Sequence, residues 1–442
     1  MKKEKMLVKR KSTGNWSFKQ IMMFGFAIIV FASIIFMQAD NASAAKKKIK
    51  QVNNSASTSL KKGVLTVSGK GKMTKKLIPT QAQKKKIKKI IIKKGITELP
   101  EEAFAGCNKA EEITISSSVR KIGMHAFSDT AVKDMVIPKT VKGIGWGICE
   151  RCKQLESLTV PGNFKVLKPS SDKYYEPFVV GEYALKTVKF STALEPELVR
   201  MVGDCEKFEL QDSDPNYKSI DGMIYTKDGK TLVRIPYGRS EADIAEGCET
   251  IAVGSYVYKV NYFYEPQSYG GCGRLNKITI PKTVKKVTDS VYSENIWYGY
   301  MDYRENYDAI EIKIETQELD ENSIKTLWKV KSWRKSLAKD LERNKYAEDA
   351  NGMIILSSGY LCGYIGQKDV KVTIPDSVNV IGENVFEDSS QVYQITIGKN
   401  VKIIEKAAFY GHKNLTVYIK GDNIKISNNV FWQCKNYTIK FE

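Results

Sequence analysis

The residues of this chain that could carry out chemistry are eight cysteines and two histidines. His125 and His412 cannot build a multi-histidine metal centre, and they leave few candidates for a His-dependent catalytic site. Cys149 and Cys152 form a C-x-x-C pair, the spacing of a redox motif or of half a zinc site, but no second pair follows. A glycine-rich phosphate loop, G-x-S-x-G and H-E-x-x-H are also absent from the sequence. We therefore expect no catalytic residues, no metal and no cofactor.

An internal repeat explains more simply where these residues stand. The step from Phe104 to Phe127 is 23 residues, and it recurs near the C-terminus at Phe386, Phe409 and Phe431 with steps of 23 and 22. The repeated unit is I-x-I-(P)-x-x-V-x-x-I-x-x-x-A-F-x-x-C-x-x-L. Its alternating β-branched opening predicts a short strand with one buried side. The three- to four-residue apolar spacing around A-F predicts a helical or 3₁₀ turn on the opposite wall.

Stacked copies of this unit can bury the apolar side chains that a single copy leaves exposed. The sequence therefore predicts coils with strands about 4.7–4.9 Å apart in a parallel sheet, and a ladder of phenylalanines behind that sheet. The same register places His412 at the corner of a coil. His125 stands just before an A-F pair, where we expect it to face solvent.

The register also gives most cysteines a packing role. Cys107, Cys152 and Cys434 follow the Phe position by three residues, where a small side chain fills the corner of a coil, and Cys149 occupies the Phe position itself. Cys107 and Cys152 belong to coils two apart. Their predicted separation of about 9.5 Å exceeds the roughly 4.4–6.8 Å between the Cα atoms of a disulfide. We expect mostly reduced, buried thiols.

Several segments resemble the BspA-like leucine-rich repeats of bacterial cell-surface proteins. The likeness is carried by residues 95–107 (GITELPEEAFAGC) and 374–378 (IPDSV). Residues 63–71 are similar to the strand that precedes such arrays, residues 214–232 to a hairpin that interrupts them, and residues 352–354 to the start of a degenerate copy. The resemblance covers roughly residues 60–442. It implies an α/β leucine-rich-repeat solenoid with small β-hairpin and helical insertions, and a surface adhesion or interaction module that is usually not an enzyme.

The N-terminus predicts export. Residues 1–20 contain seven Lys and Arg, and the 17 residues from Ile21 to Met37 carry no charge. Ala42 and Ala44 then supply an A-x-A cleavage pattern, so residues 1–44 are predicted to be a secretory signal peptide. An uncleaved signal anchor is the alternative, because a membrane span needs only about 17–25 apolar residues. Both interpretations place the rest of the chain outside the cytoplasm, as a secreted or cell-surface protein.

The charge of the exported part stays strongly positive. The whole chain has a net charge of +20, and loss of residues 1–44 leaves +15. Lysine runs such as 46–48 and 84–86 open this part. For an exported protein they indicate attraction to an anionic cell-wall polymer, or simply a well-solvated face, rather than nucleic-acid binding. A structural envelope component held by this basic surface is therefore the alternative function.

The expected partner-binding site lies where the repeat is interrupted. Residues 168–186 lengthen one unit, and another carries 13 extra residues before Cys272. Ten of the 23 tyrosines stand between positions 256 and 307. Tyrosine and tryptophan dominate many recognition surfaces, so we expect an extracellular protein or glycan, of host matrix or a neighbouring cell, to bind here. The alternative is that these aromatics form a satellite core. The candidate residues are Tyr262, Phe263, Tyr264, Tyr269, Trp297, Tyr298, Tyr300, Tyr303 and Tyr307.

A further interruption, from Glu321 to Leu341, has apolar residues at steps of three and four with Lys and Arg between them. It predicts a basic amphipathic helix, which either seeks a membrane surface or partner groove or packs on an edge of the solenoid. The predicted organisation is a signal peptide or anchor (1–44), a basic segment and β cap (45–84), a first repeat array (85–212), a hairpin interruption (213–240), an array with aromatic-rich insertions (241–315), a helical insertion with a second degenerate hairpin (316–368) and a C-terminal array (369–442).

Overall fold

The structure is a computed structural model. It describes residues 54–167, 185–200, 205–236, 238–252, 275–288, 311–328, 334–366, 371–387 and 389–442. The predicted leader and all nine candidate aromatic residues lie outside these ranges. Among the described residues, no helix has both the length and the apolar character needed to cross a membrane.

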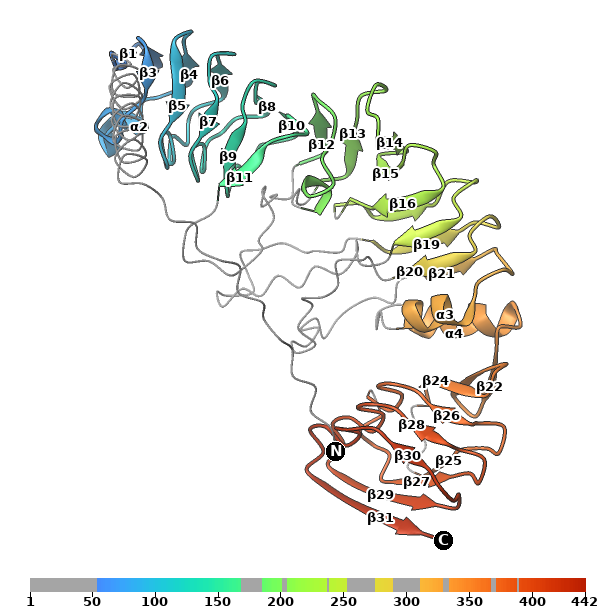
Figure 1. Ribbon diagram of the computed structural model, residues 1–442. Coiled ribbons are helices and arrows are strands. Elements are labelled where there is room, and N and C mark those ends of the chain that lie inside the picture. The colour runs from blue at the N-terminus through green and yellow to red at the C-terminus, as the bar shows by residue number, and fades with distance from the viewer. Residues whose placement is uncertain are drawn as a thin grey trace, which may run out of the picture. The chain divides into compact units, whose positions relative to one another are not determined.

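Each coil begins with a short strand, which forms the first wall of the solenoid (Figure 1). In β4 (Lys89–Ile92) Ile90 and Ile92 are buried, while Lys89 and Ile91, which alternate with them, are only half-buried. This is the alternation that the β-branched pattern predicts. The first-wall strands are β2 (Val64–Ser68), β4, β6 (Glu112–Ile115), β8 (Asp134–Val136), β10 (Ser157–Val160), β12 (Thr187–Phe190), β13 (Lys207–Glu209), β17 (Glu241–Asp243), β19 (Lys277–Ile280), β21 (Glu311–Ile314), β25 (Lys371–Thr373), β27 (Gln394–Ile397), β29 (Asn414–Ile419) and β31 (Asn436–Phe441).

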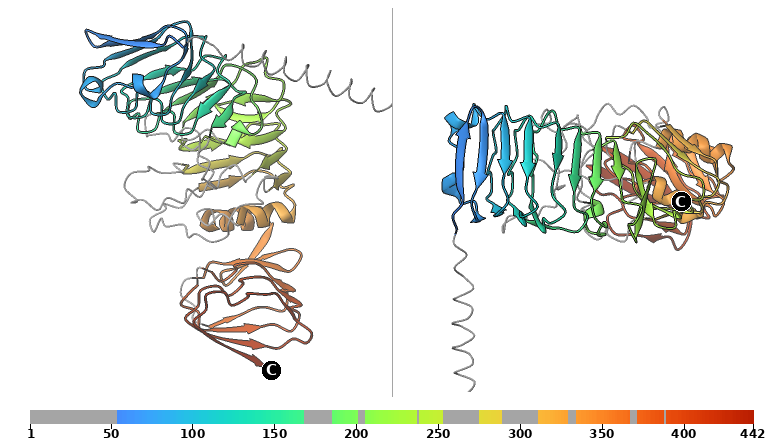
Figure 2. Two further views of the ribbon diagram at one scale, coloured as in Figure 1. Left: turned by 60° about the vertical axis from the view of Figure 1, so that its left-hand side comes forward. Right: turned by 90° about the horizontal axis from the view of Figure 1, so that it is seen from above.

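The pairing of these strands confirms the solenoid and its repeat length. β4 and β6 are parallel, with Ile90 opposite Ile113, one step of 23 residues. In the C-terminal array β27 and β29 are parallel, with Ile397 opposite Ile419, a step of 22. Figure 2 shows the blue and green strands of the N-terminal array one behind another.

The V-x-x-I stretch of the unit forms a second wall of very short parallel strands, which the repeat pattern did not predict. Ile122 of one coil lies opposite Leu99 of the coil before it and Ile144 of the coil after it. The second-wall strands are β3 (Gly71–Lys72), β5 (Ile96–Leu99), β7 (Lys121–Ile122), β9 (Gly143–Gly145), β11 (Lys165–Leu167), β18 (Thr250–Ala252), β20 (Lys286–Thr288), β26 (Val380–Ile381), β28 (Ile403–Ile404) and β30 (Lys425–Ile426).

The A-F segment forms the third wall, which consists of turns linked from coil to coil. Within a coil, the Cys107 amide donates to the Phe104 carbonyl, a three-residue turn of the 3₁₀ type. Between coils, the Phe104 amide donates to the Ala126 carbonyl at 2.8 Å, and the Phe386 amide donates to the Ala408 carbonyl at 3.0 Å. Backbone groups of the third wall are thereby satisfied by the neighbouring coil.

The hydrogen bonds between neighbouring turns of the third wall require a left-handed backbone on both sides of the Phe position. The residue two before it has a φ between 50° and 62° at Glu102, His125, Gly147, Asn384, Ala407 and Asn429. The residue two after it has a φ between 55° and 79° at Gly106, Asp129, Arg151, Gly411 and Gln433. Most of these are not glycine, and each left-handed residue of that kind costs on the order of 1 kcal/mol. The hydrogen bonds between coils offset that strain.

Antiparallel hairpins join the arrays and enter the walls. The β1 strand (Ser57–Lys61) pairs with β2 and so covers the first coil. Two further hairpins end in strands, β16 and β24, that continue in parallel as members of the second wall. Their strands are β14 (Tyr217–Ile220), β15 (Met223–Thr226), β16 (Thr231–Arg234), β22 (Ala347–Ala350), β23 (Met353–Leu356) and β24 (Tyr360–Tyr364). Short helices are η1 (Lys75–Leu77), α2 (Gln81–Lys84) and η2 (Leu198–Arg200).

The predicted amphipathic helix is instead two helices, α3 (Glu321–Trp328) and α4 (Arg334–Arg343), separated by residues outside the described ranges. They pack on β20 and β21, with Ile324 and Leu337 buried (Figure 1). Their polar side chains satisfy the strand edges: the Val287 amide donates to Ser323 Oγ at 2.7 Å, and the Ile314 amide donates to Asp340 Oδ2 at 2.6 Å. Packing on an edge of the solenoid, one of the two predicted roles, is therefore confirmed.

The buried apolar side chains fall into three clusters along the chain, one for each array. Behind the strands runs the predicted phenylalanine ladder. The rings of Phe104 and Phe127 stack with centroids 5.6 Å apart, and those of Phe386, Phe409 and Phe431 follow at 5.8 Å and 5.4 Å. The ladder of the N-terminal array stops at Cys149, which occupies the next Phe position and is buried.

Candidate functional site

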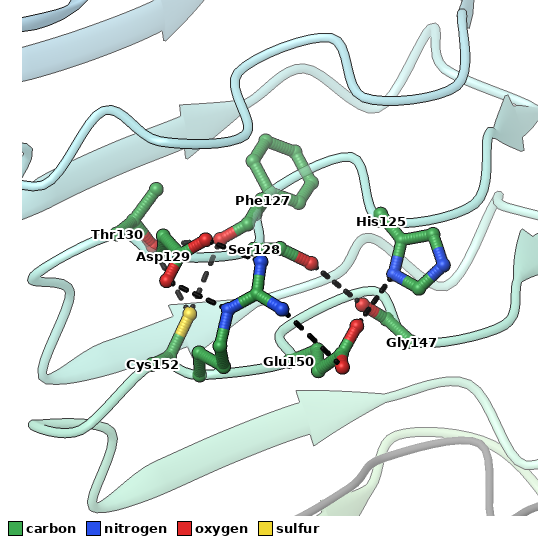
Figure 3. A network of polar contacts seen from close by, with 9 residues as sticks. His125, Phe127, Ser128, Asp129, Thr130, Gly147, Glu150 and Cys152 are labelled. Atoms are coloured by element: carbon green, nitrogen blue, oxygen red, sulfur yellow. Dashed lines mark hydrogen bonds and ion pairs between the residues drawn. The ribbon is translucent and has the colours of Figure 1, made fainter. Parts of the chain in front are cut away.

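A network of polar side chains lies on the third wall, between the coils of Phe127 and Cys149 (Figure 3). His125 Nδ1 is 2.8 Å from Glu150 Oε2. Arg151 donates from Nε and Nη2 to the two carboxylate oxygens of Asp129, at 2.9 Å and 2.6 Å, and its Nη1 lies 3.6 Å from Glu150 Oε1. The cluster is therefore a network of four charged or titratable side chains that joins two coils.

Local packing positions His125 in this network. The residue is held in the left-handed conformation of the third wall, with a φ of 50°. Its ring meets Trp146 edge-on, with centroids 4.8 Å apart, and lies so close over Gly147 that a Cβ there would be 2.6 Å from the ring. The imidazole side chain is 24% exposed, so His125 faces solvent only in part. The ring is partly covered because it pairs with the carboxylate of Glu150 on the next coil.

The chemistry available to this cluster is ionic bonding between coils. The hydrogen bond to Glu150 raises the pKa of His125, against the lowering effect of its burial. Ser128 is the hydroxyl nearest in sequence, but it is buried and donates to the Gly147 carbonyl at 3.0 Å. It therefore lacks the bond to a histidine base that activates a serine nucleophile.

This pairing predicts a pH-dependent stability. Because the folded pKa of His125 lies above its ordinary value near 6.5, the ion pair contributes fully below that pH and is lost as the pH rises through the folded pKa. The wild-type protein should lose about 1–2 kcal/mol of stability over this rise that the His125→Gln variant does not lose. Urea unfolding at pH 5.5 and pH 9 measures the difference. Equal losses in the two proteins would show that the pair contributes nothing.

The cysteines occupy the packing positions that the register predicts. Cys152 Sγ donates to the Phe127 carbonyl at 3.1 Å and lies 3.3 Å from Thr130 Oγ1, which fills the corner of the coil before it. All seven cysteines of the described ranges are free thiols; six are buried and Cys434 is half-buried. The prediction of mostly reduced, buried thiols therefore agrees with the structure for six of these seven, while Cys434 is buried only in part and Cys272 lies outside the described residues.

Burial also suppresses the reactivity of these thiols. It raises the pKa of Cys107 to about 11 and that of Cys362 to about 12. In the C-x-x-C pair, the hydrogen bond with Cys152 and then burial raise the pKa of Cys149 well above its usual value. The thiolate is the form that attacks substrates and binds metals, so these thiols are suited to packing.

His412 is a corner residue, as predicted. Its side chain is completely buried, with Nδ1 3.2 Å from the Tyr410 carbonyl, and burial lowers its pKa below the usual value. In the part of the chain that the structure describes, no three side chains of His, Cys, Asp or Glu come together as a metal site requires.

The aromatic candidates lie outside the described residues, but the strands that flank them do not. Residues 253–274 follow β18 and residues 289–310 follow β20, and these strands are parallel neighbours with Ala252 opposite Thr288. The chain returns at β19 and β21, which are also parallel neighbours, with Lys277 opposite Glu311. The two aromatic-rich segments therefore start from adjacent coils at the same wall, between the second-wall strand and the next first-wall strand.

A shared point of attachment could have been recognised in the sequence, because both segments follow the V-x-x-I position of their units. The His125–Glu150 pair was harder to find. The two residues are 25 positions apart, three more than the 22-residue step between these two coils, so they do not occupy equivalent positions.

A family model agrees with the repeat architecture. The model of the BspA type leucine rich repeat region matches six copies, within residues 80–174 and 366–439. No curated protein matches the chain.

Solved structures of bacterial repeat proteins are similar to this chain at low identity. A leucine-rich repeat protein from Eubacterium ventriosum is 16% identical, with 88% of this chain and 83% of that chain covered and a TM-score of 0.32. The pneumococcal vaccine antigen PcpA is 14% identical, with 88% and 96% covered and a TM-score of 0.33. A leucine rich cell surface protein from Faecalibacterium prausnitzii is 15% identical, with 89% and 94% covered and a TM-score of 0.28.

Proposed function

Because this chain is built of BspA-type leucine-rich repeats, we propose that it is an exported cell-surface interaction module that binds a protein or glycan partner without chemical change. The polar and sulfur-containing side chains at its coil corners support this proposal, since packing and bonds between coils occupy them. The predicted secretory leader supports the location. A non-enzymatic role is part of the same proposal.

The paired attachment of the two aromatic-rich segments is the observation that carries the proposal. Segments 253–274 and 289–310 start from strands in direct register, Ala252 opposite Thr288. Two neighbouring insertions rich in tyrosine can contribute to a single binding surface, since aromatic side chains bring a large contact area and a hydrogen-bonding tip. The rigid coils on either side would hold that surface in place.

Deletion of residues 257–271 and 292–308 should abolish capture of the partner and leave thermal stability nearly unchanged, because the flanking strands pair without these residues. Pull-down from extracellular-matrix and cell-wall fractions identifies the partner, and titration of that partner measures the loss. If the aromatics instead form a satellite core, the deletion will lower the melting temperature, and the site assignment will be wrong.

A point-substituted variant shows whether binding depends on the aromatic side chains themselves, because it keeps the full length of both segments. Replacing Trp297, Tyr298 and Tyr300 by serine should weaken partner binding at least about tenfold, because aromatic residues supply most of the energy of such contacts. The matched control replaces three exposed aromatics elsewhere by serine: Tyr393 is 46% exposed, Trp432 39% and Phe441 76%. Equal loss in both variants would contradict a localised site.

A structural envelope component held to anionic cell-wall polymer is the second candidate function. It is favoured by the exposed lysines of the first coils. High salt separates the two functions, because screening weakens the attraction between lysine and polymer more than an aromatic contact.

A further inference from the structure

The positive charge of the exported part is confined to its beginning. Residues 98–442 contain 46 Lys and Arg and 48 Asp and Glu, a net charge of −2. Residues 45–97 contain 17 lysines and no Asp, Glu or Arg. Nearly neutral repeats therefore follow a segment of very high positive charge.

Within the described residues, the fold gathers several of these lysines at two corners of the first coils. The Lys88 amide donates to the Gly63 carbonyl at 2.8 Å, so the turn of Lys61 and Lys62 lies beside residues 85–88. The Lys93 amide donates to the Val67 carbonyl at 2.9 Å, so Lys93 and Lys94 mark the corner at the other end of β2 and β4. Lysines 23 to 27 positions apart in the sequence, such as Lys62 and Lys86, thus become neighbours on adjacent coils.

Ion pairs neutralise lysines that face the next coil. Lys72 lies 2.8 Å from Glu98, Lys75 lies 3.6 Å from Glu101, and Lys89 pairs with Glu112. Eight exposed lysines of residues 54–97 have no carboxylate partner among the described residues. This lysine face consists of Lys61, Lys62, Lys76, Lys85, Lys86, Lys88, Lys93 and Lys94.

Apart from its positive charge, the lysine face has few groups that could recognise a partner. Residues 54–97 contain no aromatic residue, no histidine and no arginine. None of the large apolar side chains of this segment is exposed. It therefore lacks the aromatic platforms that stack nucleic-acid bases, the apolar side chains that enter a lipid interface, and the Trp, Tyr and Arg that anchor protein interfaces. Lysine ammonium groups bind phosphate as point charges, without a fixed geometry.

We propose that the lysine face binds a linear phosphodiester polymer without bases, such as a polyol-phosphate chain of the cell envelope. The proposal rests on the export proposed above but not on the aromatic segments. At a corner shared by two neighbouring coils, successive phosphates of one flexible chain can meet successive lysines. Binding of this kind is driven by release of counterions, so its affinity falls steeply with salt.

The test compares two variants of the full chain that lose four charges each. One replaces Lys61, Lys62, Lys86 and Lys88 of the lysine face by glutamine. The matched control replaces Lys402, Lys413, Lys420 and Lys425, which are also exposed and lack a carboxylate partner among the described residues. Binding to fluorescently labelled poly(glycerol phosphate) is measured by anisotropy between 50 and 200 mM salt, and circular dichroism verifies that both variants are folded.

The lysine-face variant should bind roughly a hundredfold more weakly at about 0.1 M salt, with a shallower dependence on salt, while the control keeps most of its affinity. Equal losses in the two variants would overturn the proposal, because they would show attraction to net charge alone. Tighter binding to phosphatidylglycerol vesicles or to single-stranded DNA of equal charge would overturn it in favour of a membrane or a nucleic acid. Partner capture through the aromatic segments is a separate readout, so either proposal can fail alone.

Discussion

Replacing Gly145 by alanine should destabilise the N-terminal array by about 3 kcal/mol or more. Gly145 is the last residue of β9, where the backbones of successive coils touch. A Cβ there would lie 2.1 Å from the Met124 nitrogen and 2.3 Å from the Gly123 carbonyl carbon. Gly123 is in the same situation, since its Cβ would lie 2.3 Å from the Glu101 nitrogen. No side-chain rotation can relieve such an overlap, because both partners are backbone.

The matched control is Gly143→Ala in the same strand. Its Cβ would lie 3.5 Å from the Cδ1 atom of Leu167, an ordinary contact with a flexible side chain, so the cost should stay below about 1 kcal/mol. Guanidinium unfolding of both variants measures the difference. A small loss at Gly145, or equal losses at the two positions, would show that the coils do not approach as closely as described.

The features that could be predicted from the sequence are those that depend on the spacing of the repeat along the chain. A step of 22 or 23 residues fixes which isoleucines pair, and it stacks Phe104 on Phe127. The corner thiols follow from the same count. Each is a consequence of parallel neighbours in register, so a single sequence is enough to derive it.

The third wall was predictable only in outline, because its backbone leaves little trace in residue type. Glycine usually marks a left-handed conformation, yet Glu102, His125 and Ala407 adopt it at equivalent positions. Hydrogen bonds between coils impose the conformation, and they are invisible in the composition of one unit. The two-residue strands of the second wall are similarly too short to show alternation.

The polar cluster and the division of the helical insertion into two helices escaped prediction for a related reason. His125 pairs with Glu150 across a step of 25, so an alignment of equivalent positions does not bring them together. The periodicity from 321 to 341 was correct for apolar faces, but it could not show that α3 and α4 are separate helices that pack on different strands. The aromatic candidates for partner binding remain a prediction, since they lie outside the described residues.

Replacing Phe409 by alanine should cost about 3–5 kcal/mol in the C-terminal array. The ring is completely buried and lies between the tilted rings of Phe386, with centroids 5.8 Å apart, and Phe431, with centroids 5.4 Å apart. Truncation removes the contacts of both neighbours and leaves a cavity that rigid coils cannot close. Phe409→Leu keeps most of the apolar volume, so it should cost about 1–2 kcal/mol.

Phe431→Ala should cost about half as much stability as Phe409→Ala, because the Phe431 ring is half-buried. It stacks on Tyr437 and meets Phe409 at a tilt. In a solenoid each coil is stabilised mainly by its neighbours, so loss of the Phe409 ring should also uncouple the coil of Phe386 from that of Phe431. Hydrogen exchange tests this: in Phe409→Ala the amides of β29 and β31 should exchange faster than those of β25. Uniform exchange across these strands, or equal costs at the two positions, would mean that the ladder does not transmit stability from coil to coil.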